Sequence, residues 1–223
     1  MTGKEKTPKK RSEPRWPVEL AILALLYLLV ELPGRIKLFP SWVLFAAGIV
    51  VLGPMFVAGL TGARHRWQLL ERWITLVFVA VTGTFMVATL AFLVRAMVLQ
   101  TVDLSGLQLL TSGIAVWVTV VLVFSLLYWQ IDRGGPEGRM TDAITRPDWL
   151  FPQQGASAED APPGWRPSFV DYLFLGFSTA TAFSTTDVIP LTSRAKMLMM
   201  LESTISLVTI VMVASRAINI LGS

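Results

Sequence analysis

Residues 177–196 read FSTATAFSTTDVIPLTSRAK, and this stretch decides how the C-terminal part of the chain can fold. The short apolar run 169–181 leads into it, and the long apolar run 195–220 follows it. A helix over the short run has about 13 residues, too few to cross a hydrocarbon core about 30 Å thick. The sequence therefore predicts a short helix, then a segment rich in Ser and Thr, then a long helix.

The composition is that of a membrane protein with several spans. The 223 residues are 53% hydrophobic and have a mean hydropathy of +0.60, which is high for a soluble domain. The chain has no cysteine and one histidine, which excludes disulfides, thiol chemistry and a multi-histidine metal site. We expect no metal ion and no cofactor. An enzyme is not expected either, because no nucleophile–base pair is visible.

Four apolar runs precede the C-terminal part and define a membrane region over residues 17–129. The expected spans are 17–32, 40–60, 73–99 and 107–129. The first is short for a span, and a basic turn containing Arg64, His65, Arg66 and Arg72 is expected after the second. Together with the last run, these spans predict an all-α integral membrane protein with about five transmembrane helices.

Two polar segments flank this membrane region. Residues 1–16 carry six Lys or Arg, which favours a basic cytoplasmic tail beside the lipid bilayer over a nucleic-acid-binding arm. Residues 130–166 are rich in Pro, Gly, Asp and Glu and predict a polar loop outside the hydrocarbon. Residues 167–223 form the remaining unit: the short helix, the Ser/Thr-rich segment and the last helix.

The order of features in residues 167–223 is typical of a re-entrant pore loop. Irregular backbone at membrane depth is tolerated only where protein or a water-filled cavity surrounds it. Ion channels use this exception, since a helix ends near the midplane and the carbonyls and hydroxyls after it line a path. The Ser/Thr cluster has a second interpretation as helix-packing residues, because small hydroxyl side chains are common at membrane helix interfaces.

The segment resembles the pore domain of potassium channels, whose filter reads Thr-Thr-Val-Gly-Tyr-Gly-Asp-x-x-Pro. Aligned on the Asp, this chain matches at Thr181, Asp187 and Pro190. The resemblance implies that the filter or pore-lining residues are Thr181, Ala182, Phe183, Ser184, Thr185, Thr186 and Asp187. Ser184 and Thr186 replace the two filter glycines, and they resist the backbone angles that glycine accepts. The replacement predicts weak or altered potassium selectivity.

The resemblance implies an oligomeric channel, a homotetramer, that conducts a monovalent cation. A ring of Asp187 carboxylates would favour cations at its mouth. Glu202, Ser203 and Ser206 are the inner-helix candidates, because carboxylates within membrane spans usually have a pore, a proton path or a basic partner. The missing glycines leave open a non-conducting membrane module or partner-binding subunit. A small-solute transporter is disfavoured by the lack of an internal repeat.

The whole chain also resembles a group of uncharacterised bacterial integral membrane proteins. The shared features are Tyr128, Trp129, 132–136, 148–153 and 183–187. This resemblance implies the bacterial cytoplasmic membrane as the location and supplies no activity.

The number of spans determines which face of the membrane the loop opens to. Four spans before the loop place it on the same side as the N-terminus. The basic tail and the basic turn after the second span favour a cytoplasmic N-terminus, so the loop would open toward the cytoplasm, opposite to potassium channels. The alternatives are a first run that lies on the membrane surface, or an external N-terminus.

Overall fold

The computed structural model describes most of the chain, and all structural statements concern that part. The described residues are 14–31, 46, 48–53, 65–99, 106–140, 146–157, 159–162, 164–181 and 188–221. The helices are α1 (Trp16–Glu31), α3 (His65–Leu99), α4 (Gly106–Ile131), α5 (Pro136–Met140), α6 (Phe169–Thr181) and α7 (Ser193–Leu221). Two 3-10 turns, η1 (Asp132–Gly134) and η2 (Pro152–Gln154), and two short strands, β1 (Trp149–Leu150) and β2 (Ile189–Pro190), join them.

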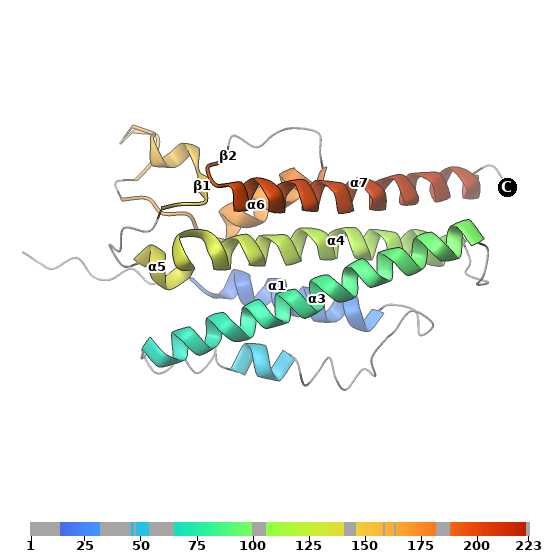
Figure 1. The fold of residues 1–223 in the computed structure, drawn as a ribbon, viewed down its shortest axis with the longest axis horizontal. Helices are drawn as coiled ribbons and strands as arrows, with labels where there is room; N and C mark the ends of the chain where they lie inside the picture. The colour runs from blue at the N-terminus through green and yellow to red at the C-terminus, as the bar shows by residue number, and fades with distance from the viewer. Residues whose placement is uncertain are drawn as a thin grey trace, which may run out of the picture.

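Helix α4 lies at the centre of the bundle. It packs against α1, α3, α6 and α7, and the ribbon in Figure 1 shows these helices on its two sides. Its sequence is apolar around the whole circumference, as expected for a helix with neighbours on every side. Among the long helices α4 therefore has the largest buried share, and α7 has the smallest.

Three helices of the described part are long and apolar enough to cross a membrane. They cover Leu69–Leu99, Leu107–Gly134 and Ser193–Ser215. The apolar part of α1, Trp16–Val30, is shorter than the roughly 20 residues that a span needs. The expected helical membrane fold is confirmed at this level. The count of five spans stays a prediction, because most of the run 40–60 lies outside the described residues.

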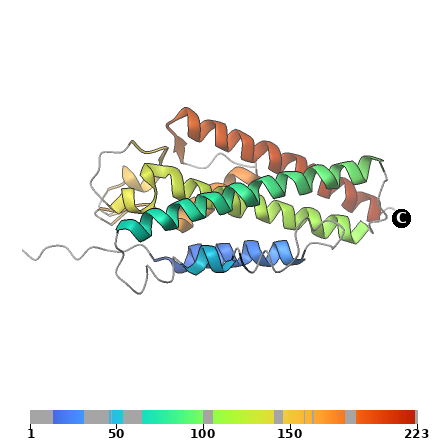
Figure 2. The same cartoon turned by 60° about the horizontal axis from the view of Figure 1, so that its bottom comes forward.

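One end of the bundle gathers the polar connections. Arg15, just before α1, forms a 2.9 Å ion pair with Glu71 near the start of α3. Arg194 of α7 donates to the carbonyl of Ile131 at the end of α4 over 3.5 Å. The starts of α1, α3 and α7 and the end of α4 thus share one end, on the left in Figures 1 and 2, which we call the polar end.

The first turns of α3 correct one expectation. His65, Arg66 and Arg72 were expected in a basic turn, with the third span beginning at 73, whereas α3 begins at His65. Arginine is a good helix former, and at a helix end its long side chain can reach out of the apolar layer. The basic residues therefore extend the helix. Arg64 lies outside the described residues.

The described residues of the polar stretch 130–166 include short helical turns, a strand and buried aromatic side chains. Trp149 and Phe151 are buried against the bundle, with the ring centroids of Tyr128 and Trp149 4.7 Å apart. The turn after α4 has positive φ at Arg133, Gly134 and Gly135, of 51°, 81° and 89°. A Cβ atom at Gly135 would lie 2.9 Å from the carbonyl oxygen of Gln130, so glycine is required there for space as well as for conformation.

Candidate functional site

The short helix α6 lies between α4 and α7 and begins at the polar end. The Asp171 carboxylate closes its first turn by accepting from the backbone N–H and from the hydroxyl of Ser168, each over 2.8 Å. Phe169 and Tyr172 are buried, and the Phe169 ring meets Trp129 of α4 edge-on. The helix predicted over 169–181 is confirmed with the same bounds.

The far end of α6 is held by hydroxyl groups of α7. Ser203 donates to the carbonyl of Thr179 over 3.3 Å, and Ser206 donates to the carbonyl of Ala180. Trp117 of α4 in turn donates to the Ser206 hydroxyl over 3.0 Å. Carbonyls in the last turn of a helix lack partners within the helix, and here side chains supply them. Ser206 lies about 20 Å along α7 from its start, so α6 ends within the bundle.

The chain is back at the polar end by β2. This strand pairs antiparallel with β1, Trp149 opposite Pro190 and Leu150 opposite Ile189, and the Leu191 N–H donates to the carbonyl of Asp148 over 2.8 Å. Thr181 closes α6, and its hydroxyl donates to the carbonyl of Ser178 over 3.0 Å. The other predicted filter residues lie outside the described residues: Ala182, Phe183, Ser184, Thr185, Thr186 and Asp187.

A network of polar side chains, buried at Asp132, Asp148 and Tyr172, ties the elements together at the polar end. Tyr172 of α6 donates to the Asp132 carboxylate over 2.5 Å, and the Asp148 N–H donates to its other oxygen over 2.7 Å. The Asp148 carboxylate accepts from the Thr192 hydroxyl over 2.6 Å and forms an ion pair with Arg194. We call Asp132, Asp148, Tyr172, Thr192 and Arg194 the polar clamp. It joins the end of α4, the β1 segment, α6 and the start of α7.

The clamp gives a role to two segments that were expected only from the predicted bacterial resemblance. These segments, 132–136 and 148–153, had no role assigned from the sequence. In the structure Asp132 and Asp148 are buried and adjacent. Buried carboxylates need hydrogen-bond partners. A lone Asp directly after the apolar run of α4 and another directly before Trp149 were the available signals.

The carboxyl group of Glu202 lies inside the bundle. Its side chain has no exposed surface (0%), and Tyr128 of α4 donates to its Oε2 over 2.5 Å. Its Oε1 has no hydrogen-bond partner among the described residues. Glu202 and Ser206 thus point into the packing of one chain, toward α4 and α6, while Ser203 is half-buried.

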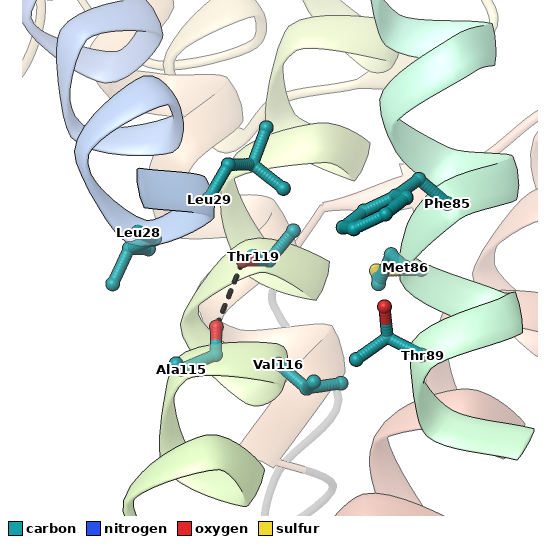
Figure 3. A pocket seen from close by; sticks show the side chains of 8 residues that line it. All are labelled: Leu28, Leu29, Phe85, Met86, Thr89, Ala115, Val116 and Thr119. Atoms are coloured by element: carbon teal, nitrogen blue, oxygen red, sulfur yellow. Dashed lines mark hydrogen bonds between the residues drawn. The ribbon is translucent and has the colours of Figure 1, made fainter. Parts of the chain in front are cut away.

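A small cavity opens between α1, α3 and α4, about midway along α4 (Figure 3). The cavity has room for about one water molecule. Thr89 points toward it with a hydroxyl that has no partner among the described residues, while Thr119 donates to the carbonyl of Ala115 over 2.8 Å. Among all the residues that the structure describes, no group of three or more His, Asp or Glu side chains could hold a metal ion.

Comparison with family models, with curated proteins and with solved structures finds no match to this chain. The potassium-channel resemblance therefore stays a prediction from the sequence. The position of α6, and the way in which the chain enters and leaves the bundle around it, are the observations that bear on function.

Proposed function

We propose that the chain is one subunit of a homo-oligomeric pore-loop channel of the bacterial cytoplasmic membrane. It conducts monovalent cations, with weak or altered selectivity for potassium. The observation that carries the proposal is the end of α6, whose last carbonyls are bonded to Ser203 and Ser206 of α7 in the middle of the bundle. A helix end at that depth needs protein or water around it. Pore loops place one there so that the next residues line a path.

The return of the chain to the polar end supports the same proposal. The entrance of α6 is fixed by Tyr172 and Asp132, and the exit is fixed by the pairing of β2 with β1. The stretch between them, 182–187, carries the predicted filter residues. A loop that enters and leaves at one end can line the mouth of a pathway without crossing the membrane.

An oligomer follows from the number of loops per chain. One chain supplies one loop, and a central pathway needs several copies arranged by closed symmetry. The potassium-channel resemblance implies four. Exposed apolar side chains on α6 and α7 are available to lipid and to neighbouring subunits; they include Phe174, Phe177, Met200, Leu207 and Val211.

Cation flux into reconstituted vesicles tests the proposal. We expect both K⁺ and Na⁺ to pass, and we expect Asp187→Asn to lower the flux by roughly tenfold at low salt, because the carboxylate ring concentrates cations at the mouth. Glu159→Gln is the matched control, since Glu159 is an exposed acidic residue of the stretch that joins α5 to α6. An absence of flux through a folded oligomer would contradict the proposal.

The second candidate is a non-conducting membrane module that binds a partner. It is favoured by the way in which polar and apolar side chains are distributed on α7. The polar residues Glu202, Ser206 and Thr209 are buried inside the chain. Apolar residues, among them Met197 and Leu201, are exposed. An exposed apolar face suits contact with lipid or with a partner helix better than it suits the lining of a water-filled ion pathway. The mass of the purified protein in lipid nanodiscs separates the two, since a monomer cannot enclose a central path.

A further inference from the structure

Glu202 occupies an unusual position for an acidic side chain. It lies near the middle of the membrane-spanning part of α7, facing α4 and α6, and none of its surface is exposed. Carboxyl groups at such positions are costly to bury and in membrane proteins mark functional sites. Tyr128 satisfies Oε2 by donating over 2.5 Å.

The other oxygen, Oε1, lies against α6 at Gly176. A Cβ atom added to Gly176 would lie 3.4 Å from Oε1, 2.5 Å from the hydroxyl of Ser125 and 3.2 Å from the carbonyl of Val121. The absence of a side chain at Gly176 therefore lets α6 approach three oxygen atoms closely. Two belong to α4 and one belongs to α7.

These three oxygens lack a hydrogen to share. Ser125 already donates its hydroxyl hydrogen to the carbonyl of Val121 over 2.6 Å. The carbonyl can only accept, and Oε1 has no donor among the described residues. A single added hydrogen would turn Oε1 from an acceptor without a partner into a donor.

The charges around Glu202 also leave it without a cation. Tyr128 is the titratable group that faces it from α4. From α6 it meets Gly176, and Oε1 has no hydrogen-bond partner among the described residues. Arg194, on α7 itself, is bound to Asp148 at the polar end. A proton would supply the missing hydrogen and remove the uncompensated charge at once.

We propose that the carboxyl group of Glu202, bonded to Tyr128 and packed against Gly176, is a proton-binding site in the membrane interior. The proton resides on Oε1, while Oε2 keeps the hydrogen of Tyr128. A metal cation fits less well, since Ca²⁺ takes six to eight oxygen ligands and Mg²⁺ an octahedron, and only the oxygens of Ser125 and Val121 are found with Oε1 around Gly176. The site does not depend on whether the chain conducts.

The neighbours of Glu202 on α7 give the site a structural consequence. Ser203 and Ser206 hold the carbonyls at the end of α6, and Gly176 of α6 lies against the carboxyl group. Binding or loss of the proton therefore acts on the short helix that precedes residues 182–187.

Infrared spectroscopy of the purified full-length protein tests the proposal through the C=O stretch of a protonated carboxyl group. We expect a band that Glu202→Gln abolishes and that Tyr128→Phe shifts, because the phenol bonds directly to this carboxyl group. Asp171→Asn is the matched control, since the Asp171 carboxylate is bonded at the start of α6, and we expect it to leave the band in place.

Identical spectra of the wild type and a folded Glu202→Gln variant, at every pH at which both fold, would overturn the proposal. If the glutamine variant fails to fold, Tyr128→Phe decides the matter: a shifted band supports the site, and an unshifted band overturns it. Melting in Na⁺ against choline tests the rival occupant. A rise of the melting temperature in Na⁺ that depends on Glu202 would assign the Glu202 site to a metal cation and overturn the proton assignment.

Discussion

The carboxylate of Asp132, at the end of α4, accepts the backbone N–H of Asp148 over 2.7 Å. The Asp148 carboxylate in turn accepts from the Thr192 hydroxyl and forms an ion pair with Arg194, at the start of α7. Two acidic residues that are 16 positions apart thus link α4, the β1 segment and α7 in one continuous network. The polar clamp fixes the points at which the chain enters α6 and begins α7.

Removal of one clamp donor tests how much the network stabilises the fold. Tyr172→Phe deletes the hydroxyl that donates to Asp132 over 2.5 Å and leaves a buried carboxylate oxygen without its partner. We expect a loss of about 1–2 kcal/mol of stability, visible as a lower melting temperature in detergent. Tyr27→Phe is the control, since Tyr27 is exposed on α1. Equal melting temperatures of the two variants would contradict the role of the clamp.

The ion pair of the clamp is tested by a double-mutant cycle. Asp148→Asn and Arg194→Gln each break the pair, so the double variant should be less destabilised than the sum of the two single variants. Since Asp148 is buried and Arg194 is largely exposed, we expect a coupling of about 1 kcal/mol. Lys196→Gln, an exposed cation on the same helix turn, is expected to change stability little. Strict additivity would show that the pair contributes nothing.

The close approach of α6 to α4 depends on Gly176. Alanine there places a Cβ atom 2.5 Å from the Ser125 hydroxyl oxygen and 3.2 Å from the carbonyl of Val121. We expect Gly176→Ala to destabilise the protein by about 1–3 kcal/mol and Ser125→Ala to restore part of this loss in the double variant. Gly83→Ala is the control, because its Cβ would meet only an ordinary contact 3.5 Å away. A Gly176→Ala variant as stable as the wild type would contradict this packing.

The shared polar end predicts which residues face the same side of the membrane. The chain has no cysteine, so single cysteines can be labelled with a membrane-impermeant maleimide. We expect Pro14→Cys and Ala156→Cys to react from one side and Leu107→Cys, at the other end of α4, to react from the opposite side. From the positive-inside rule we expect the first side to be cytoplasmic. Labelling of positions 14 and 156 from opposite faces would contradict the fold.

The apolar runs were sufficient to predict the main helices. Expected spans over 107–129 and 195–220 correspond to α4 and α7, and the short helix α6 has the bounds that its run predicted. Run length and polarity determine such elements directly, because a membrane helix must satisfy its backbone internally and cover its surface with apolar side chains. The start of α3 was missed since a basic helical turn at the membrane surface has the composition of a loop.

Contacts between distant residues could not be predicted in the same way. Tyr128 and Glu202 are 74 positions apart, and no local pattern indicates that they meet. Trp149 and Phe151 stand in a stretch of polar composition, yet they are buried because the β1 segment folds back onto α4 and α6. Ser203 and Ser206 were expected only as inner-helix candidates, and the structure places both against the end of α6.

The most direct test of the channel proposal is the current through planar bilayers that contain the purified oligomer, recorded across a salt gradient. The proposed channel predicts a current whose reversal potential has the sign of cation selectivity, with little preference for K⁺ over Na⁺. Asp187→Asn should move the reversal potential toward zero, and Glu159→Gln should leave it unchanged. A folded wild-type oligomer that carries no current, or a reversal potential of the opposite sign, would contradict the account.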